Sequence, residues 1–142
     1  MPVAYLDVPP GIPADAKKPL VQEIFAALDE AYRIPDTRIF IREWPLENVS
    51  QDGRLDNAPP RPVVSLEVAP GISVDEKRSM VKRISAAVTA AYHLSDVLIF
   101  LREYPLDMVG LDDGLQSENP VILRAMEQAA ASRRTGTGPG TT

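Results

Sequence analysis

Two halves of this 142-residue chain are copies of one unit. Residues 2–52 align with residues 62–112 without a gap, and nearly half of the aligned positions are identical. The motifs that recur in register include Pro10-Gly11-Ile12 with Pro70-Gly71-Ile72, and Ile39-Phe40-Ile41-Arg42-Glu43 with Ile99-Phe100-Leu101-Arg102-Glu103. Self-similarity of this length indicates a duplicated and fused unit, so both halves are expected to fold alike.

Each unit is predicted to fold as a strand, a helix and a second strand. Apolar residues dominate residues 3–8, and Pro9-Pro10-Gly11 then ends the strand because proline cannot continue a ladder. A helical period follows, with apolar residues at Leu20, Val21, Ile24, Ala27, Leu28 and Ala31 and at the matching positions of the second unit. The β-rich stretches 39–44 and 99–104 come next. Since a helix separates the two strands of a unit, they should be parallel and joined by a right-handed crossover.

The predicted fold class is α/β, with two fused β-α-β units forming one four-stranded sheet, two helices on one face of it, and a C-terminal helix. The expected boundaries are a first unit over 1–53, a linker over 54–61, a second unit over 62–116, a helix over 117–134 and a disordered tail over 135–142. Ser117-Glu118-Asn119-Pro120 indicates the start of the last helix, because proline is tolerated in a first helical turn. The whole is expected to be a single compact domain.

Composition excludes several kinds of protein. The net charge is -5 and no run of Lys or Arg occurs, which argues against nucleic acid and an anionic membrane surface as partners. The sequence has no cysteine and one histidine, His93, so thiolate chemistry and metal sites built on sulfur or clustered histidines are excluded. No apolar run approaches the roughly 20 residues needed to span a bilayer. We therefore expect a cytoplasmic protein that works without a cofactor or a metal.

Pro2 is the candidate catalytic residue. Removal of Met1, which a small second residue permits, would leave a free secondary amine at Pro2. An α-amino group has a pKa of roughly 8, and burial in an apolar pocket lowers it, so this amine can be a neutral base near neutral pH. The same amine could also attack a carbonyl as a nucleophile. The nitrogen of its counterpart Pro62 lies in a peptide bond, so one chain has at most one amine site.

Arg42 and Arg102 are cations repeated in otherwise apolar strands. Either guanidinium could bind a carboxylate or a developing enolate of the substrate. The alternative is an ion pair at a strand end or a subunit contact. Trp44 and Tyr104 follow at matched positions, and are expected either to line the mouth of a pocket or to pack in an interface.

The layout of the repeat resembles the tautomerase superfamily. A strand beginning at Pro2, a Pro-Gly turn, a helix and a second strand are similar to the short subunit of 4-oxalocrotonate tautomerase. Residues 2–114 resemble the fused two-unit members, which include cis-3-chloroacrylic acid dehalogenase and malonate semialdehyde decarboxylase. The resemblance implies β-α-β units, an assembly that is typically a homotrimer, and an N-terminal proline that acts as general acid or base.

The resemblance also assigns two further residues. Arg38 matches approximately the second arginine of the tautomerases, and is expected to bind substrate. Asp112 stands near the place of the glutamate with which the dehalogenases activate water, which makes it a candidate acid or base. Ile12 and Ile72 depart from the family, because related proteins carry a carboxylate-binding arginine in one of these turns.

Enol–keto chemistry on a small carbonyl or enol acid is therefore the favoured function. The alternatives are decarboxylation, dehalogenation or hydration, and an iminium-type reaction at Pro2. A further alternative is a binding or assembly protein that keeps the fold without the activity.

Overall fold

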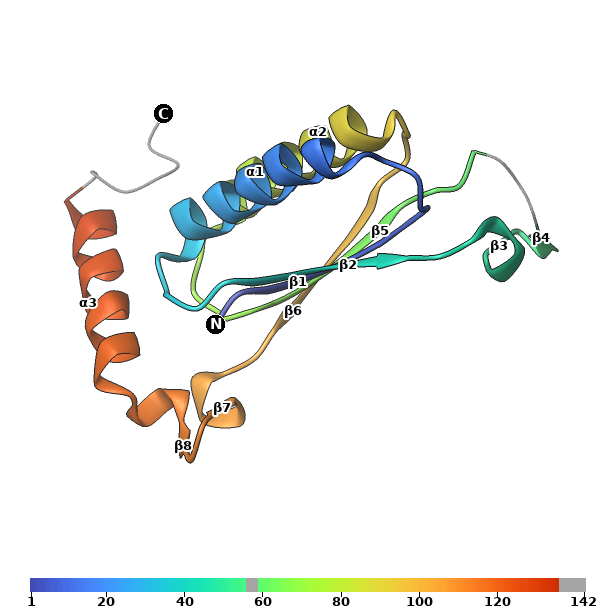
Figure 1. Ribbon diagram of the computed structural model, residues 1–142. Helices are drawn as coiled ribbons and strands as arrows, with labels where there is room; N and C mark the ends of the chain where they lie inside the picture. The colour runs from blue at the N-terminus through green and yellow to red at the C-terminus, as the bar shows by residue number, and fades with distance from the viewer. Residues whose placement is uncertain (56–58, 136–142) are drawn as a thin grey trace.

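Both halves of the chain fold as predicted in the computed structural model, which describes residues 1–55 and 59–135. The first unit consists of β1 (Val3–Val8), α1 (Ala14–Tyr32) and β2 (Arg38–Glu43), and the second of β5 (Val63–Val68), α2 (Val74–Tyr92) and β6 (Leu98–Glu103). The strand order is β2-β1-β5-β6, with parallel pairing inside each unit and antiparallel pairing of β1 with β5. Both helices cover the same face of this sheet (Figure 1). The predicted fold class is therefore confirmed.

A local twofold axis relates the two units. The central strands pair so that Tyr5 lies opposite Ser65, its own counterpart in the repeat. In the helix layer, Arg83 of α2 forms ion pairs with Glu23 and Glu30 of α1. Glu23 is the counterpart of Arg83, so the helices also meet close to the axis. If both copies carried the same charged residue at this position, two like charges would repel each other near the axis. Because the two copies differ here, Arg83 and Glu23 attract each other instead.

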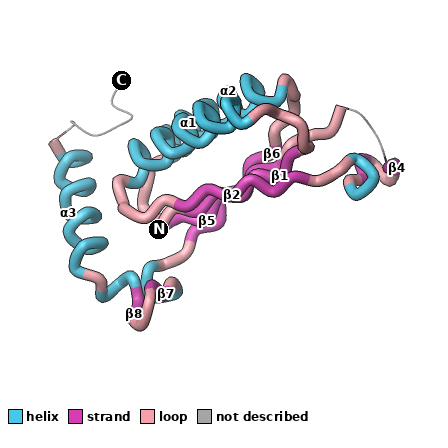
Figure 2. The backbone as a smooth tube through the Cα atoms, viewed as in Figure 1, coloured by secondary structure: helices cyan, strands magenta, loops and turns pink. Residues whose placement is uncertain are grey.

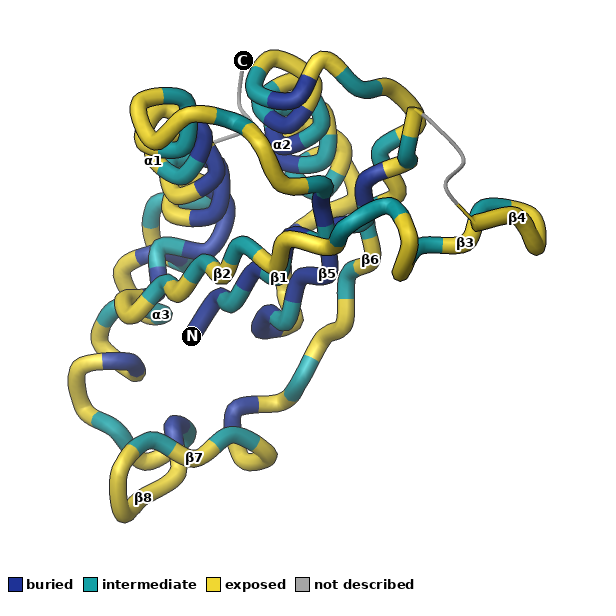
Figure 3. The backbone as a smooth tube through the Cα atoms, turned by 45° about the vertical axis from the view of Figure 1, so that its right-hand side comes forward, coloured by how far each residue is buried: buried dark blue, intermediate teal, exposed yellow. Residues whose placement is uncertain are grey.

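The hydrophobic core lies between the helices and the sheet. Ala4, Leu6 and Val8 of β1 are buried while their neighbours in sequence are half-buried, as the alternation of a strand requires. The helices contribute residues at the helical period, which are Leu20, Ile24, Ala27, Leu28 and Ala31 in α1 and Met80, Ile84 and Val88 in α2. Figure 3 shows these buried stretches facing one another across the layer between the helices and the central strands.

The ends of the helices are set by local backbone chemistry. Gly11 and Gly71 have φ of 111° and 115°, a conformation that other residues rarely adopt, and they turn the chain from strand toward helix. Ser73 and Glu76 form a capping box at the start of α2. Both helices end at a tyrosine, followed by Arg33 or His93 in the left-handed conformation. The helices thus end a few residues before the turns at Pro35-Asp36 and Ser95-Asp96.

Each unit ends in short elements that the sequence analysis did not predict. β2 is followed by η1 (Leu46–Asn48), β3 (Ser50–Gln51) and β4 (Arg54–Leu55), and β6 by η2 (Leu106–Met108), β7 (Gly110–Leu111) and β8 (Gly114–Leu115). Figure 2 shows the two resulting hairpins projecting at opposite ends of the sheet. The expected linker over 54–61 was therefore placed partly inside a hairpin, because β4 occupies its first residues.

The C-terminal segment turns back along the end of the sheet. It consists of η3 (Gln116–Glu118) and α3 (Pro120–Arg134), and the Asn119 side chain caps α3 by accepting hydrogen bonds from the N–H groups of Val121 and Ile122. Of the tail expected to be disordered, residues 136–142 lie outside the described residues. Among the residues that are described, no helix is both long and apolar enough to cross a membrane.

Candidate functional site

A cavity of about 280 Å³ lies beside the N-terminus. Its walls come from both ends of the chain, with Met1, Val3, Asp36 and Arg38 on one side and Val109, Gly110, Leu111, Asp112 and Gln116 on the other. Figure 1 shows the reason for this arrangement, since the N-terminus lies at the end of the sheet toward which the β7–β8 hairpin and α3 turn. The C-terminal segment of the second unit thus completes a site that begins in the first.

The chain begins in a buried position at the edge of this cavity. The Met1 side chain is 5% exposed and its amine donates a hydrogen bond to the Pro35 carbonyl at 2.6 Å. Burial lowers the pKa of this amine to about 6, although the Asp36 carboxylate opposes the shift. Pro2 is fully buried, and its carbonyl accepts a hydrogen bond from the Arg38 N–H at 3.0 Å. This environment favours a neutral amine over an ammonium.

Arg38 and Asp36 form a bidentate ion pair on the cavity wall. Arg38 Nε lies 3.0 Å from Asp36 Oδ1, and Nη2 lies 2.9 Å from Oδ2. The hydrogen bond from Arg38 lowers the pKa of the Asp36 carboxyl and keeps it ionised. Arg38 Nη1 has no hydrogen-bond partner among the described residues. The guanidinium is therefore held in place by one edge and retains a terminal nitrogen for an anionic ligand.

Asp112 approaches Arg38 from the opposite wall. It stands in the turn of the β7–β8 hairpin with a left-handed φ of 55°, which aspartate tolerates better than most residues. Asp36 above all, and Asp112 to a smaller extent, raise the pKa of the Arg38 guanidinium. The structure thus places two of the residues predicted from the sequence, Arg38 and Asp112, on the wall of one cavity that Met1 also lines. Pro2 follows Met1 in the chain and is fully buried.

Arg102 and Tyr104 lie at the same end of the sheet as the N-terminus. The strand register places four residues in one row across the sheet, namely Arg38, Val3, Glu67 and Arg102. Arg102 Nη1 lies 3.9 Å from Glu67 Oε1. The N–H of Tyr104 donates to the Val68 carbonyl at 2.8 Å, and its side chain packs half-buried against the core. Neither side chain lines the cavity, so their roles in substrate binding stay predictions.

Arg42 and Trp44 lie at the opposite end of the sheet. Both contact Asp7, with Arg42 Nη2 at 2.8 Å from Oδ2 and Trp44 Nε1 donating to Oδ1 at 2.7 Å. The Arg42 guanidinium also lies 4.7 Å from the ring centroid of Tyr5, which stacks on Phe40. Within one chain these contacts match the structural alternative, an ion pair near a strand end. The predicted substrate-binding role of Arg42 and Trp44 is left to experiment.

The two ends of the sheet are related by the local twofold axis, but they differ in chemistry. The end near Pro62 has a smaller cavity of about 80 Å³, whose lining includes Arg61 and Val63, the counterparts of Met1 and Val3. Leu98 stands there in place of Arg38. Because the Pro62 nitrogen is also an amide, the duplicated fold has one end equipped with both an amine and a guanidinium.

Two polar residues of the cavity, Asp36 and Gln116, were not assigned from the sequence. Asp36 stands two residues before Arg38 in a turn, a spacing from which an ion pair could have been predicted. Gln116 lies beyond the repeat, and no pattern in the sequence shows that the chain returns to the N-terminus there. Over residues 1–55 and 59–135, no three His, Asp or Glu side chains gather as ligands for a metal ion.

No family model and no curated protein matches the sequence, whereas solved structures match the fold. A fused 4-OT wild-type symmetric trimer matches with a TM-score of 0.70 and 22% identity, covering 80% of this chain and 94% of that chain. Pt0534 inactivated by 2-oxo-3-pentynoate matches at 0.71 and 16% identity, covering 82% and 99%. Malonate semialdehyde decarboxylase matches at 0.61 and 16% identity, covering 79% and 92%. The chain has the fused 4-OT fold. The architecture implied by the resemblance to the tautomerase superfamily is thereby confirmed.

Proposed function

We propose that the chain is a cofactor-independent tautomerase in which the Pro2 amine, freed by removal of Met1, acts as general base and general acid. The observation that supports this most strongly is the buried start of the chain beside a cavity lined by Arg38. The pKa of the Met1 amine is about 6 in this position because of burial. Pro2 lies one residue further in and is fully buried, so the same desolvation favours a neutral Pro2 amine near neutral pH.

The proposed reaction moves one proton across a small enol or carbonyl acid. Neutral Pro2 takes the proton of the enol hydroxyl, and the resulting enolate is stabilised by the guanidinium of Arg38 through Nη1. The Pro2 ammonium then returns the proton to the neighbouring carbon, which gives the keto form and restores the neutral amine. Asp36 does not react, but its two hydrogen bonds hold Arg38 in the required orientation.

The charges around the cavity favour a substrate with a single carboxylate. Arg38 is the cation that lines the cavity, and it is flanked there by the carboxylates of Asp36 and Asp112. The turn positions Ile12 and Ile72 add no further cation. A dicarboxylate would therefore place more negative charge beside Asp36 and Asp112 than Arg38 balances.

A second candidate function rests on Asp112. Its carboxylate lies on the wall opposite the N-terminus, where it could accept a proton from water and direct that water to an unsaturated acid. The malonate semialdehyde decarboxylase of similar fold has decarboxylase and hydratase activities. If this chain is a hydratase, Asp112→Asn should abolish hydration, whereas the tautomerase proposal predicts that the same variant keeps its ketonisation activity.

Labelling with 2-oxo-3-pentynoate tests the proposed amine. Intact mass first shows whether Met1 has been removed. Addition of a neutral secondary amine to this electrophilic alkyne expels no group, so we expect an adduct with the mass of the whole reagent, located on Pro2 by peptide mapping. Phenylpyruvate, a small keto acid, should slow the labelling by occupying the site. Retention of Met1, or labelling spread over the exposed lysines with none at Pro2, would contradict the proposal.

A further inference from the structure

Asp112 has no side-chain partner, although it lines the cavity beside the N-terminus. It stands in the turn of the β7–β8 hairpin, and among the described residues no hydrogen bond or ion pair involves its carboxylate. Its counterpart Asp52, in the same turn of the first unit, has the Gln51 amide beside it, with Nε2 at 3.5 Å from Oδ2. Leu111 takes the place of Gln51 in the second unit, so the hairpin offers Asp112 no such donor.

Asp112 and Arg38 interact across the cavity without forming an ion pair. The Asp112 charge contributes to the raised pKa of the Arg38 guanidinium, which indicates that the carboxylate lies within electrostatic range of Arg38. The ion pair of Arg38, however, is with Asp36, and none joins it to Asp112. Since both side chains line a cavity of about 280 Å³, a ligand can lie between them.

The two walls of the cavity suit opposite kinds of group. The charge of Arg38 is balanced by Asp36 through two hydrogen bonds, and Nη1 stays available to an anionic ligand. Asp112 supplies an acceptor and a negative charge that no group of the described residues balances. One wall thus favours a carboxylate, and the other favours a cation or a hydrogen-bond donor.

We propose that Asp112 determines the specificity of the site by binding the end of the ligand that lies away from its carboxylate, so that the site selects small monocarboxylic acids with an amino or other hydrogen-bond-donating group at that end. The inference deepens the proposed function and rests on it for the contact of the ligand carboxylate with Arg38. The Asp112 carboxylate attracts such a group and repels a second carboxylate, so it acts on both sides of the selection. The far end of the ligand takes no part in the proton transfer at Pro2.

Three acids that differ only at the far end test this assignment without turnover. We would titrate the processed full-length protein at low salt with 6-aminohexanoate, hexanoate and adipate, following binding by NMR. The series is repeated with the four-carbon acids 4-aminobutanoate, butanoate and succinate, so that the result does not depend on one chain length. In the length that spans the cavity, Asp112→Asn should weaken binding of the amino acid about 5-fold and tighten binding of the dicarboxylate about 5-fold, as a solvated charge pair provides. Binding of the unsubstituted acid should change least.

Two further variants separate this role from a structural one. Asp112→Asn is expected to fold, because asparagine also tolerates the left-handed conformation of this turn. Asp52→Asn removes the same charge from the equivalent turn, where φ is 54°, and should leave all the affinities unchanged. Arg38→Gln should weaken all three acids together, since it removes the cation that their shared carboxylate contacts.

The opposite signs of the two expected shifts distinguish the outcomes. No change in Asp112→Asn at either chain length, or a change of the same sign for all three acids, would overturn the role of Asp112. Tighter binding of all three would show that Asp112 competes with the ligand carboxylate for Arg38 instead. Unchanged affinities in Arg38→Gln, or failure of the wild type to bind any of the acids, would also overturn it.

Labelling of Pro2 by 2-oxo-3-pentynoate judges the proposed function separately. Labelled Pro2 without the two opposite shifts would overturn the role of Asp112 alone. The two shifts without labelling would overturn the chemistry of Pro2 alone, and the absence of both would overturn both proposals.

Discussion

At the residue scale, the nitrogen of the first proline differs in kind between the two copies of the repeat. In Pro2 it becomes the amine of the chain once Met1 is removed, whereas in Pro62 it is a peptide nitrogen. Pro2 and Pro62 are both fully buried, and the carbonyl of each accepts a hydrogen bond at 3.0 Å from the first residue of the adjacent parallel strand, Arg38 or Leu98. The backbone geometry is thus duplicated, while the chemistry is not. Removal of Met1 would create a secondary amine at one end only, and that end also carries the guanidinium.

The pH dependence of the proposed reaction should respond in opposite directions to two substitutions. The Pro2 amine must be neutral to act as base, so kcat/KM should rise with pH and level off above the pKa of that amine, which burial is expected to lower from its ordinary value of roughly 8. The Asp36 charge raises the pKa of the amine at this position and Arg38 lowers it. Asp36→Asn should therefore move the rising limb to lower pH, and Arg38→Gln should move it to higher pH. Identical profiles in the wild type and both variants would contradict the placement of the amine beside this ion pair.

At the scale of the elements, Arg133 joins α3 to the helix layer. Arg133 Nη2 donates to the Ala31 carbonyl in the last turn of α1 at 2.6 Å, and Nε lies 3.3 Å from Glu76 Oε2 in the first turn of α2. A cation is favourable at the C-terminal end of α1, and the last turn of α1 carries no basic residue of its own. Arg133 therefore holds α3 against the helix layer. The same C-terminal segment carries Gln116, which lines the cavity.

Removing this arginine should loosen α3. Arg133→Met keeps the aliphatic stem but loses both hydrogen bonds, and we expect a loss of about 1 kcal/mol in the free energy of unfolding, with faster hydrogen exchange in α3. Arg134→Met is the matched control, since Arg134 is exposed. Equal exchange rates in the two variants would show that α3 is held by its apolar contacts alone.

The repeat predicts the principal elements well, because each carries either a strand pattern or a helical period. The hairpins were not predicted, because strands of two residues are too short to show a periodicity, although Asp52-Gly53 indicates one of the two turns. Among the site residues, Pro2 was singled out by its position after Met1 and Arg38 by the resemblance to the tautomerases, and the roles of both stay predictions. Gln116 was not predicted, because its burial depends on the C-terminal segment turning back toward the N-terminus. No local pattern in the sequence indicates that turn.

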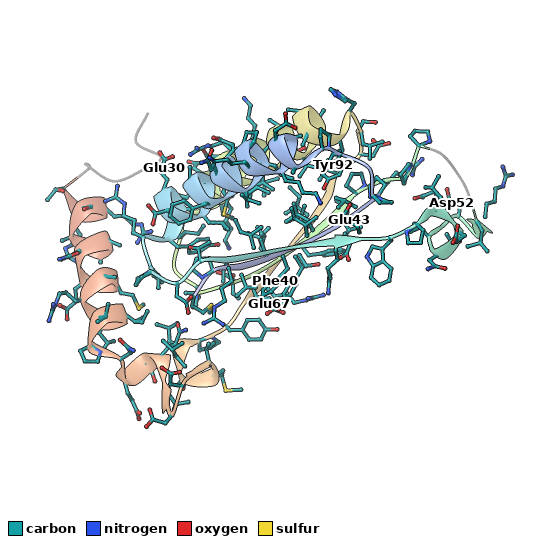
Figure 4. All side chains as sticks on the ribbon, in the orientation of Figure 1. Glu30, Phe40, Glu43, Asp52, Glu67 and Tyr92 are labelled. Carbon is teal, nitrogen blue, oxygen red and sulfur yellow. The ribbon has the colours of Figure 1, made fainter. Side chains whose placement is uncertain are left out.

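At the scale of the whole molecule, one face of the sheet is not covered by any element of residues 1–55 and 59–135. Figure 4 shows Phe40 and Glu67 on the side of the sheet away from the helices. Phe40, Leu98 and Phe100 are each about half exposed on the edge strands, beside the half-buried Tyr5. An exposed apolar patch of this kind is typical of an interface between proteins. We predict that copies of the chain meet through this face, in the homotrimer that the resemblance of the sequence to the fused two-unit tautomerases implies.

The assembly can be measured by sedimentation equilibrium. The wild type should sediment as three copies of the 15.5 kDa chain. Changing both Phe40 and Phe100 to serine should lower the mass to that of one chain, since it removes the aromatic part of the interface. Phe25→Ser is the control, because Phe25 is 48% exposed on the helix side. A wild-type monomer, or dissociation caused equally by Phe25→Ser, would contradict assembly through the sheet.

The central claim is that the Pro2 amine is the acid and base of the reaction. It is tested most directly by the rate of phenylenolpyruvate ketonisation in protein shown by mass to lack Met1, comparing the wild type with Pro2→Ala and Pro62→Ala. We predict that kcat/KM falls about 100-fold or more in Pro2→Ala, as loss of a positioned general base requires. Pro62→Ala should stay close to the wild type, because that nitrogen is an amide. Equal activity of the Pro2→Ala variant and the wild type would contradict the account.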